Sequence, residues 1–236
     1  MRAMDWLPAL ALLASFAPGV VIAFLAEHRS RLRTTLNMAA AVAQLVVVAG
    51  LIALVAMGYN PQLTLPFLAG MSLHLHTDAL SLLLAGLSAV LWLVTTPYAI
   101  GYLEDSPNRS RFFGFFSLCV TATTGVALSG NLFTLFVFYE LLTLATYPLV
   151  VHRGTPEARE AAQVYLGYTL SGGLAALVGM VWLQQVSGPV AFMPGGRPDL
   201  AGMDPATLTA IFVLLVGGFG VKAALVPLHG WLPIAM

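Results

Sequence analysis

The sequence predicts an all-α, polytopic membrane protein with about seven transmembrane helices, and three observations lead to this prediction. Charged residues make up only 8% of the chain and hydrophobic residues 59%, whereas a soluble domain carries roughly 25% charge. The apolar residues gather in runs of about 20, the length that crosses a bilayer. The arginines gather between those runs. So few charges could not cover a water-facing surface, so a soluble fold is excluded.

Seven apolar segments are long enough to be membrane helices, at approximately 6–26, 36–58, 78–103, 112–130, 131–151, 161–186 and 206–226. The first is longer than the apolar core of a signal peptide, so we expect a retained helix instead of a cleaved leader. Thr77 or Asp78 can cap the start of the third segment. Ser129, Gly130 and Asn131 predict a tight turn between the fourth and fifth. No stretch indicates a soluble domain.

The arginines predict the orientation of the chain in the membrane. The connections after the first, third and fifth segments share one side, and the other side carries far fewer arginines. The positive-inside rule therefore places the N-terminus outside the cytoplasm. The net charge is zero, so nothing indicates a nucleic-acid partner. The arginine-rich side carries Arg29, Arg31, Arg33, Arg109, Arg111, Arg153 and Arg159, and the other side carries Arg2 and Arg197.

Glu140 is the acidic residue that falls near the middle of a predicted membrane helix, nine residues after Asn131 and eight before Pro148. A charge at that depth costs about 2.5–3.5 kcal/mol on translocon scales. It should therefore face protein or water and have a partner. Glu140, Thr143 and Tyr147 follow helical spacing and share one face. We expect a carboxylate on an ion pathway, and the alternative is a polar contact that only joins helices.

Lys222, the single lysine of the chain, follows about seventeen almost entirely apolar residues. Gly217, Gly218 and Gly220 precede it and Pro227 follows, a pattern that indicates a broken membrane helix. Burial lowers the pKa of a lysine and a nearby carboxylate raises it, so a lysine paired with Glu140 could take up and release a proton. The alternative is a lysine that extends to the membrane interface.

The histidines and the cysteine give weaker evidence of function than Glu140 and Lys222. His229 follows Pro227 and has an ordinary pKa of about 6.5, which suits a proton relay, although it could also be an interfacial residue beside Trp231. His74 and His76 alternate on one side of an extended stretch, and two histidines fall short of a metal site. The single Cys119 excludes an internal disulfide and a cysteine-built cluster. We therefore expect no metal and no cofactor.

Three stretches together resemble the antiporter-like membrane subunits shared by Mrp-type Na⁺/H⁺ antiporters, respiratory complex I and membrane-bound hydrogenases. They are TDALSLLL from Thr77, NLFTLFVFYELLTLATYPLV from Asn131 and VKAALVPLHGWLPIAM from Val221. The resemblance covers most of the chain from about Asp78 onward. The separation of Glu140 and Lys222 looks most like the Mrp D-type subunit.

The resemblance implies a fold of about fourteen helices with two inverted five-helix repeats, of which this chain would hold the N-terminal half. Residues 1–110 would form an N-terminal three-helix segment, and residues 111–236 an incomplete first ion-translocating repeat that stops after the seventh helix. The chain is therefore expected to be truncated or one half of a split subunit. Two positions depart from the family pattern: Ile234 replaces an acidic residue, and Val164 stands where a lysine often precedes the aromatic Tyr165.

The resulting hypothesis is a proton-translocating subunit of a Mrp-type cation/H⁺ antiporter complex in a bacterial inner membrane. Glu140, Lys222 and His229 would carry the protons, and the partners would be other membrane subunits, H⁺ and possibly Na⁺. Alternatives are a proton-pumping subunit of a complex I-like NADH:quinone oxidoreductase or membrane-bound hydrogenase, a subunit of an inorganic carbon transporter, and an inert scaffold. The sequence holds no catalytic site of its own, so any redox activity would belong to partners.

Overall fold

The computed structural model describes residues 3–68, 71–103, 106–193, 195–196 and 198–235. The first half begins with a 3₁₀ turn, η1 (Ala3–Trp6), and contains α1 (Leu7–Ala23), α2 (Ser30–Ala56), β1 (Gln62–Leu68), β2 (Met71–His76) and α3 (Ala79–Tyr102). The second half contains α4 (Arg109–Ala127), α5 (Leu132–Val150), α6 (Pro156–Ser187), η2 (Pro198–Gly202), α7 (Pro205–Lys222) and the short α8 (Leu232–Ala235).

The predicted polytopic membrane fold is confirmed. Six helical stretches are long and apolar enough to cross a bilayer, and α4 is a further helix of 19 residues in the middle of the bundle. α4 is less apolar because it begins with two arginines and carries hydroxyl residues such as Ser117, Thr121 and Thr124 on its buried side. Its polar groups are shielded by neighbouring helices, so low hydropathy does not exclude it from the membrane.

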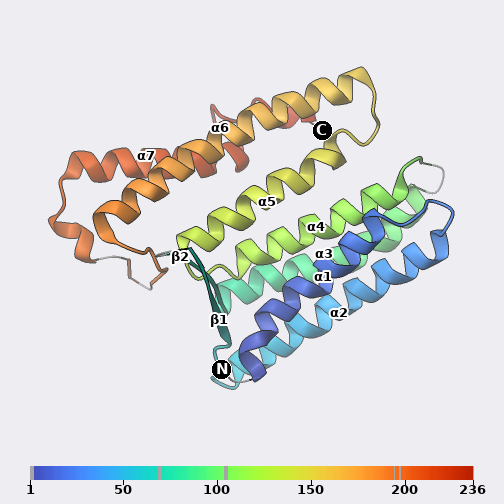
Figure 1. The fold of residues 1–236 in the computed structure, drawn as a ribbon, viewed down its shortest axis with the longest axis horizontal. Helices are drawn as coiled ribbons and strands as arrows, with labels where there is room; N and C mark the ends of the chain where they lie inside the picture. Colours follow the sequence, from blue (N-terminus) through green and yellow to red (C-terminus); the bar gives the residue numbers. More distant parts are fainter. Residues whose placement is uncertain (1–2, 69–70, 104–105, 194, 197, 236) are drawn as a thin grey trace.

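The long helices run roughly side by side (Figure 1), in the approximate order α2, α1 and α3, α4, α5, α6 and α7. Small residues set the closest approaches. A Cβ atom on Gly114 of α4 would lie 2.6 Å from Cβ of Ala23 in α1, and one on Gly125 would lie within 2.2 Å of the Phe138 ring in α5. Such contacts between small residues are typical of membrane helices.

Buried polar side chains join α4 to α1 and α2. Ser117 Oγ donates to Asn37 Oδ1 at 3.2 Å, and Gln44 Nε2 donates to Thr124 Oγ1 at 3.1 Å. Thr121 Oγ1 donates to Ser15 Oγ at 2.9 Å. Neutral hydrogen bonds of this kind contribute roughly 0.6 kcal/mol each in a membrane protein. They help to fix the register of α1, α2 and α4, and the apolar pattern of the sequence did not indicate them.

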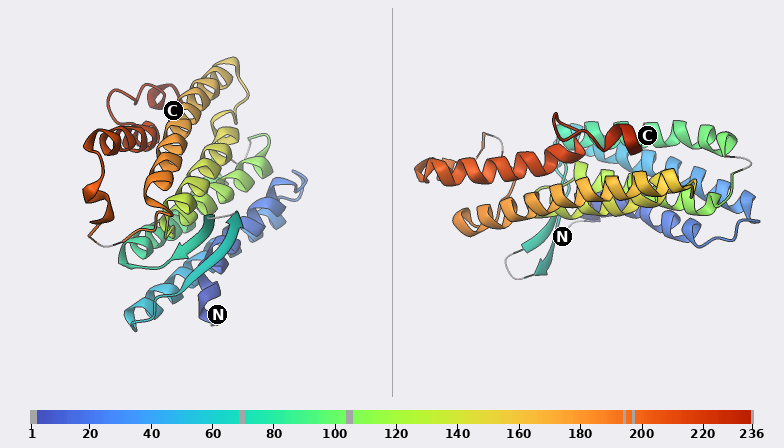
Figure 2. Two further views of the ribbon diagram at one scale, coloured as in Figure 1. Left: turned by 60° about the vertical axis from the view of Figure 1, so that its left-hand side comes forward. Right: turned by 90° about the horizontal axis from the view of Figure 1, so that it is seen from above.

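A β-hairpin between α2 and α3 is the part of the fold that the all-α prediction did not include. β1 and β2 pair antiparallel, with Leu63 opposite Leu75 and Thr64 opposite His74. The hairpin crosses the end of the bundle (Figures 1 and 2) and joins the start of α5, where Gly130 N donates to His74 O at 2.8 Å. The two strands of a hairpin can lie at a bundle end because water or protein satisfies their backbone.

The ends of the helices follow the expected local signals. Asp78 caps α3, accepting from Ser81 N at 2.7 Å in a capping box, and Asn131 caps α5, accepting from Thr134 N at 2.7 Å. The connections after α1, α3 and α5 lie at one end of the bundle, and the hairpin and the α6–α7 connection lie at the other (Figure 1). Arg197 and Glu104 fall outside the described residues. The division of the chain at residue 110 stays a prediction.

Candidate functional site

Lys222 is the last residue of α7, so its side chain lies where the helix stops. Ala224 has φ +52, the left-handed conformation that is unfavourable for a residue with a Cβ atom, and turns connect it to α8. Leu225 N still donates to Gly220 O at 3.0 Å. Pro227 lacks an N–H group and cannot continue a helical ladder.

The three glycines before Lys222 have different surroundings. A Cβ atom on Gly218 would lie 2.6 Å from Gly172 O and from Ala176 N, so this glycine brings α7 against the backbone of α6. A Cβ atom on Gly220 would lie 2.9 Å from Leu225 Cδ1, where the chain turns back on itself. A Cβ atom on Gly217 would meet nothing within 4 Å. Two of the three therefore have a packing role beside the end of α7.

The Lys222 ammonium contacts α5. Its Nζ donates to Tyr139 O at 2.5 Å and to Thr143 Oγ1 at 2.6 Å, and it lies 3.7 Å from the centre of the Tyr139 ring. The Tyr139 hydroxyl in turn donates to Gly218 O at 3.1 Å. A desolvated cation over an aromatic ring is stabilised by about 2 kcal/mol. Lys222 is therefore bound inside the protein by neutral groups and does not extend to the membrane interface.

Glu140 is half-buried and lies against α6, not against Lys222. A Cβ atom on Gly173 would lie only 2.3 Å from Glu140 Oε1, so the carboxylate occupies the space that this glycine leaves. Oε1 is buried and accepts no hydrogen bond from the described residues. No ion pair within 4.0 Å joins Glu140 to Lys222. Glu140 lies in α5 and Lys222 at the end of α7, but the direct contact between them that the sequence suggested is not made.

Aromatic residues hold the segment after α7. The Trp231 indole Nε1 donates to Val221 O at 2.8 Å, which satisfies a carbonyl in the last turn of α7. The Trp231 ring meets the Tyr165 ring edge-on at 5.4 Å, and the Tyr165 hydroxyl donates to Thr143 O at 3.5 Å. His229, in the same segment, is exposed. Tyr165 and Trp231 thus connect α6, the helix break and α5 around Lys222.

His74 and His76 lie in β2, and their rings are 6.0 Å apart. Burial lowers the pKa of His74, and the nearby His76 lowers it further. His74 lines a pocket of about 150 Å³ with mixed polar and apolar walls, between the hairpin, the start of α5 and the end of α6. Among the described residues, no group of three or more metal-ligating side chains is present.

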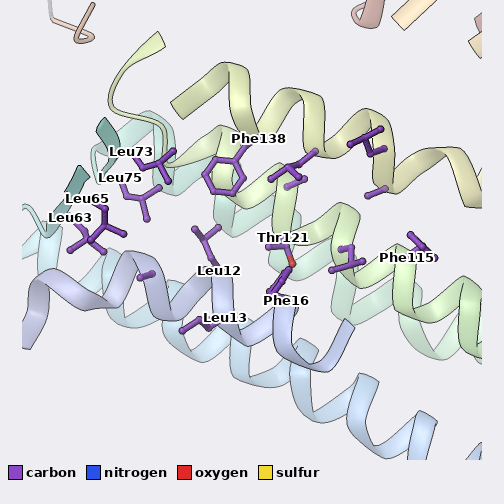
Figure 3. Close-up of a pocket in the computed structure, with 16 residues that line it drawn as sticks. Leu12, Leu13, Phe16, Leu63, Leu65, Leu73, Leu75, Phe115, Thr121 and Phe138 are labelled. Carbon is purple, nitrogen blue, oxygen red and sulfur yellow. The ribbon is translucent and has the colours of Figure 1, made fainter. Parts of the chain in front are cut away.

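An apolar pocket lies apart from this site. It has a volume of about 490 Å³ and lies between α1, the hairpin, α4 and α5 (Figure 3). Its walls are leucine and phenylalanine side chains such as Leu12, Phe16 and Phe138, with Thr121 as a polar group. The Thr121 hydroxyl is already engaged with Ser15 and the Ser117 carbonyl. The residues that line this pocket include no acid, base or charged group.

Sequence reasoning selected Glu140 and Lys222 but missed three residues of their surroundings. Tyr139 and Trp231 were overlooked because aromatic residues are common in membrane helices and carry no charge. Gly173 was overlooked because a glycine carries no functional group and small residues are common in membrane helices. The consecutive pair Gly172 and Gly173 was one signal in the sequence for close packing, since two adjacent glycines remove side chains from two neighbouring faces of α6.

The fold is a bundle of membrane-length helices with a part-buried lysine at the end of α7, and comparisons with known proteins show similarity to antiporter-type membrane proteins. Residues 129–236 match the family model described as NADH:quinone oxidoreductase/Mrp antiporter, transmembrane. The chain is 31% identical over 171 residues to a probable K⁺/H⁺ antiporter protein of the A/B type from Rhizobium meliloti, covering 71% of this chain and 17% of that protein. It is 34% identical over 170 residues to the N-type membrane protein of the NADH-quinone oxidoreductase of Desulforudis audaxviator, covering 69% and 33%.

A third relative is the D-type protein of the Na⁺/H⁺ antiporter of Bacillus subtilis, 27% identical over 159 residues, with 67% of this chain and 32% of that protein covered. The fold matches a chain of the Mrp complex from Dietzia sp. with a TM-score of 0.81 and 24% identity, covering all of this chain and 44% of that one. The chain thus spans a third or less of these curated relatives. The resemblance is confirmed: the chain is related to the antiporter-type membrane subunits of Mrp and complex I-like complexes.

Proposed function

We propose that this chain is a proton-translocating membrane subunit of a Mrp-type monovalent cation/H⁺ antiporter complex. Lys222 is the site that takes up and releases the proton, Glu140 is a second station, and His229 exchanges protons with the aqueous side. The observation that carries the proposal is the position of Lys222, an ammonium at the end of a broken helix with neutral ligands. The partners are other membrane subunits, H⁺ and Na⁺, and the location is a bacterial inner membrane with the N-terminus outside the cytoplasm.

The ligands of Lys222 suit a group that changes its protonation state. A hydroxyl both donates and accepts, so Thr143 can accept from the ammonium and donate to the neutral amine. Each hydrogen bond to a charged group contributes about 1.5–3 kcal/mol, enough to hold the ammonium away from water. A carboxylate in direct contact would favour the charged form more strongly, by about 4 kcal/mol at 4 Å and an effective dielectric of 20.

Glu140 is suited to act on Lys222 from a distance. The two groups are more than 4.0 Å apart, so their interaction is weaker than that of a contact ion pair and changes when either side chain moves. The unpartnered Oε1 costs about 1–3 kcal/mol, which a proton or a water molecule at that atom would offset. A displacement of either side chain would change the strength of this interaction across the α5–α6–α7 contact.

The test compares Lys222→Ala and Lys222→Arg in the complete complex reconstituted in vesicles, with cation-driven proton flux as the readout. Arginine keeps the positive charge but stays protonated in proteins. If Lys222 carries protons, both variants lose flux by at least tenfold while the amount of folded complex is unchanged. If Lys222 is only a structural cation, Lys222→Arg keeps most of the flux, and the proposal fails.

A second candidate function is supported by a fold match with TM-score 0.78 and 21% identity to a chain of a membrane-bound sulfane sulfur reductase, and by the similarity to a membrane protein of NADH-quinone oxidoreductase. In that case the same chain would pump protons for a redox enzyme. Purifying the complex and identifying its subunits separates the two. Co-purified flavin- or iron–sulfur-containing subunits favour the redox complex, whereas an all-membrane set of antiporter subunits favours the first candidate.

A further inference from the structure

We propose that the arginine-lined pocket at the α2–α3–α4 end of the bundle binds the phosphate group of an anionic phospholipid. The pocket has a volume of about 460 Å³. Its polar lining consists of Arg31, Arg33 and Arg109 with the hydroxyl residues Ser30, Thr34 and Thr35. Among the described residues that line it, none is acidic. The proposal is independent of the ion path around Lys222.

Arg33 is the strongest indication of a ligand. Its side chain is 3% exposed, and its Nη1 donates to Glu27 Oε2 and Glu27 O at 3.3 Å and to Ser110 Oγ at 3.1 Å. Its Nε is buried without an acceptor among the described residues. A buried guanidinium N–H without an acceptor costs more than 1–3 kcal/mol, since the group is charged. A phosphate oxygen would satisfy this donor, and arginine forks match phosphate geometry.

The helix ends around the pocket add to the attraction for an anion. α2 begins at Ser30 and α4 at Arg109, and in neither helix does the side chain of the N-cap residue, Arg29 or Asn108, cap the first N–H groups. Free N–H groups and the helix dipole both favour a negative group near a helix start. Glu27 accepts from Ser110 N at 3.0 Å and already occupies one of these positions. The pocket also brings together the side chains of Arg31, Arg33 and Arg109.

The surface beside the pocket favours a lipid over a free phosphate ion. Gly101 of α3 lines the pocket, and Tyr98, Val94, Leu91 and Leu87 continue along the same helix face, each between 52% and 70% exposed. This exposed apolar stripe is about 20 Å long at 1.5 Å per residue, enough for one leaflet of a bilayer about 30 Å thick.

The depth of the pocket fits a headgroup. Tyr98 and Tyr102 stack at 5.8 Å beside it, and exposed tyrosines mark the headgroup level of a membrane. An acyl chain lying along the α3 stripe would place its phosphate in the pocket. Basic pockets between membrane helices on the arginine-rich side are known to suit anionic headgroups. The structure therefore assigns this end of α3 to an anionic phospholipid.

The test uses the full chain, purified in detergent and mixed with equal amounts of dioleoyl phosphatidylglycerol and dioleoyl phosphatidylcholine. Native mass spectrometry then measures which lipid stays bound. We expect preferential retention of phosphatidylglycerol, reduced about fivefold by Arg31→Gln and about 25-fold by the double variant Arg31→Gln/Arg109→Gln. Fivefold corresponds to about 1 kcal/mol for each basic side chain. Both arginines stand at helix starts, where removing a cation does not destabilise the helix.

Arg153→Gln is the matched control, because Arg153 is an exposed arginine in the connection after α5, at the same end of the bundle and outside the pocket. It should leave lipid retention unchanged. Equal retention of the two lipids, or an equal loss with Arg153→Gln, would overturn the proposal. Inorganic phosphate at about 10 mM is added as a competitor, and at this concentration the charge screening length is roughly 30 Å or less. Complete displacement of phosphatidylglycerol by the phosphate would also overturn the proposal, in favour of a free-anion site.

Discussion

Gly173 offers a direct test of whether the position of the Glu140 carboxylate matters. A methyl group at this position would lie 2.3 Å from Oε1, 2.8 Å from Cδ and 3.1 Å from Oε2, whereas ordinary contact begins at 3.4 Å. Gly173→Ala therefore forces the carboxylate to move by about 1 Å, the difference between 3.4 and 2.3 Å. A displacement of about 1 Å at a reacting group can reduce a rate by about a hundredfold. We expect a ten- to hundredfold loss of proton flux in the reconstituted complex.

Gly167→Ala is the matched control on the same helix, since a Cβ atom there meets nothing within 4 Å. It should keep full flux and gain up to about 1 kcal/mol of helix stability. Thermal unfolding identifies the cause of any effect. Gly173→Ala should destabilise the wild-type protein by about 1–3 kcal/mol through overpacking. In a Glu140→Ala background the obstructing carboxylate is absent, so the same substitution should be neutral or stabilising.

Two outcomes would contradict a role for the position of the Glu140 carboxylate. If Gly173→Ala transports protons as well as Gly167→Ala, the position of the carboxylate has no influence on flux. If Gly173→Ala destabilises the Glu140→Ala variant as much as the wild type, the methyl group meets something other than Glu140. Either result would remove Glu140 from the mechanism as it is proposed here.

Three further changes probe the surroundings of the site. Thr143→Val removes the hydroxyl that accepts from Lys222, and loss of one charged hydrogen bond of about 1.5–3 kcal/mol should lower proton flux at least tenfold in the vesicle assay. Trp231→Phe removes the indole hydrogen bond to Val221 O and leaves Ala224 N as the donor to that carbonyl, so hydrogen–deuterium exchange should become faster in the segment after α7 but not in α1. Burial lowers the pKa of His74, so the neutral ring stabilises the fold above about pH 6.5 and this contribution is lost at lower pH. The melting temperature of His74→Gln should therefore depend less on pH between about 7.5 and 5.5 than that of the wild type.

The membrane helices could be predicted from sequence because the bilayer imposes a simple length and composition rule. The predicted segment 131–151 corresponds closely to α5, Leu132–Val150, and its Asn131 cap follows ordinary capping chemistry. The β-hairpin could not be predicted in the same way. Its strands have the mixed apolar and polar pattern of a connection, and their pairing with the start of α5 depends on contacts distant in sequence, such as His74 with Thr134.

The sequence predicted the charged residues of the site but not the contacts that they make. An ionisable residue within an apolar run stands out because it is costly, which is why Glu140 and Lys222 could be selected. Their actual partners are set by the rotation of α5 relative to α6 and α7. That rotation depends on small residues such as Gly173 and Gly218, whose closeness to a neighbour is invisible without coordinates. The expected ion pair was therefore replaced by separate environments on two sides of one helix.

The buried polar groups of the chain differ in what their surroundings allow. Between α2 and α4, neutral side chains such as Gln44 and Thr124 join two continuous helices, and moving them would disturb packing along the whole contact. Lys222 is attached instead to the last turn of α7, where the helical ladder has already ended. Glu140 lies where α6 has no side chain to confine it. A charged side chain can change position at low cost only where the helix beside it ends or where a glycine leaves the backbone beside it uncovered. Both ionisable groups stand at such places, and this physical asymmetry favours transport over scaffolding as the purpose of α5, α6 and α7.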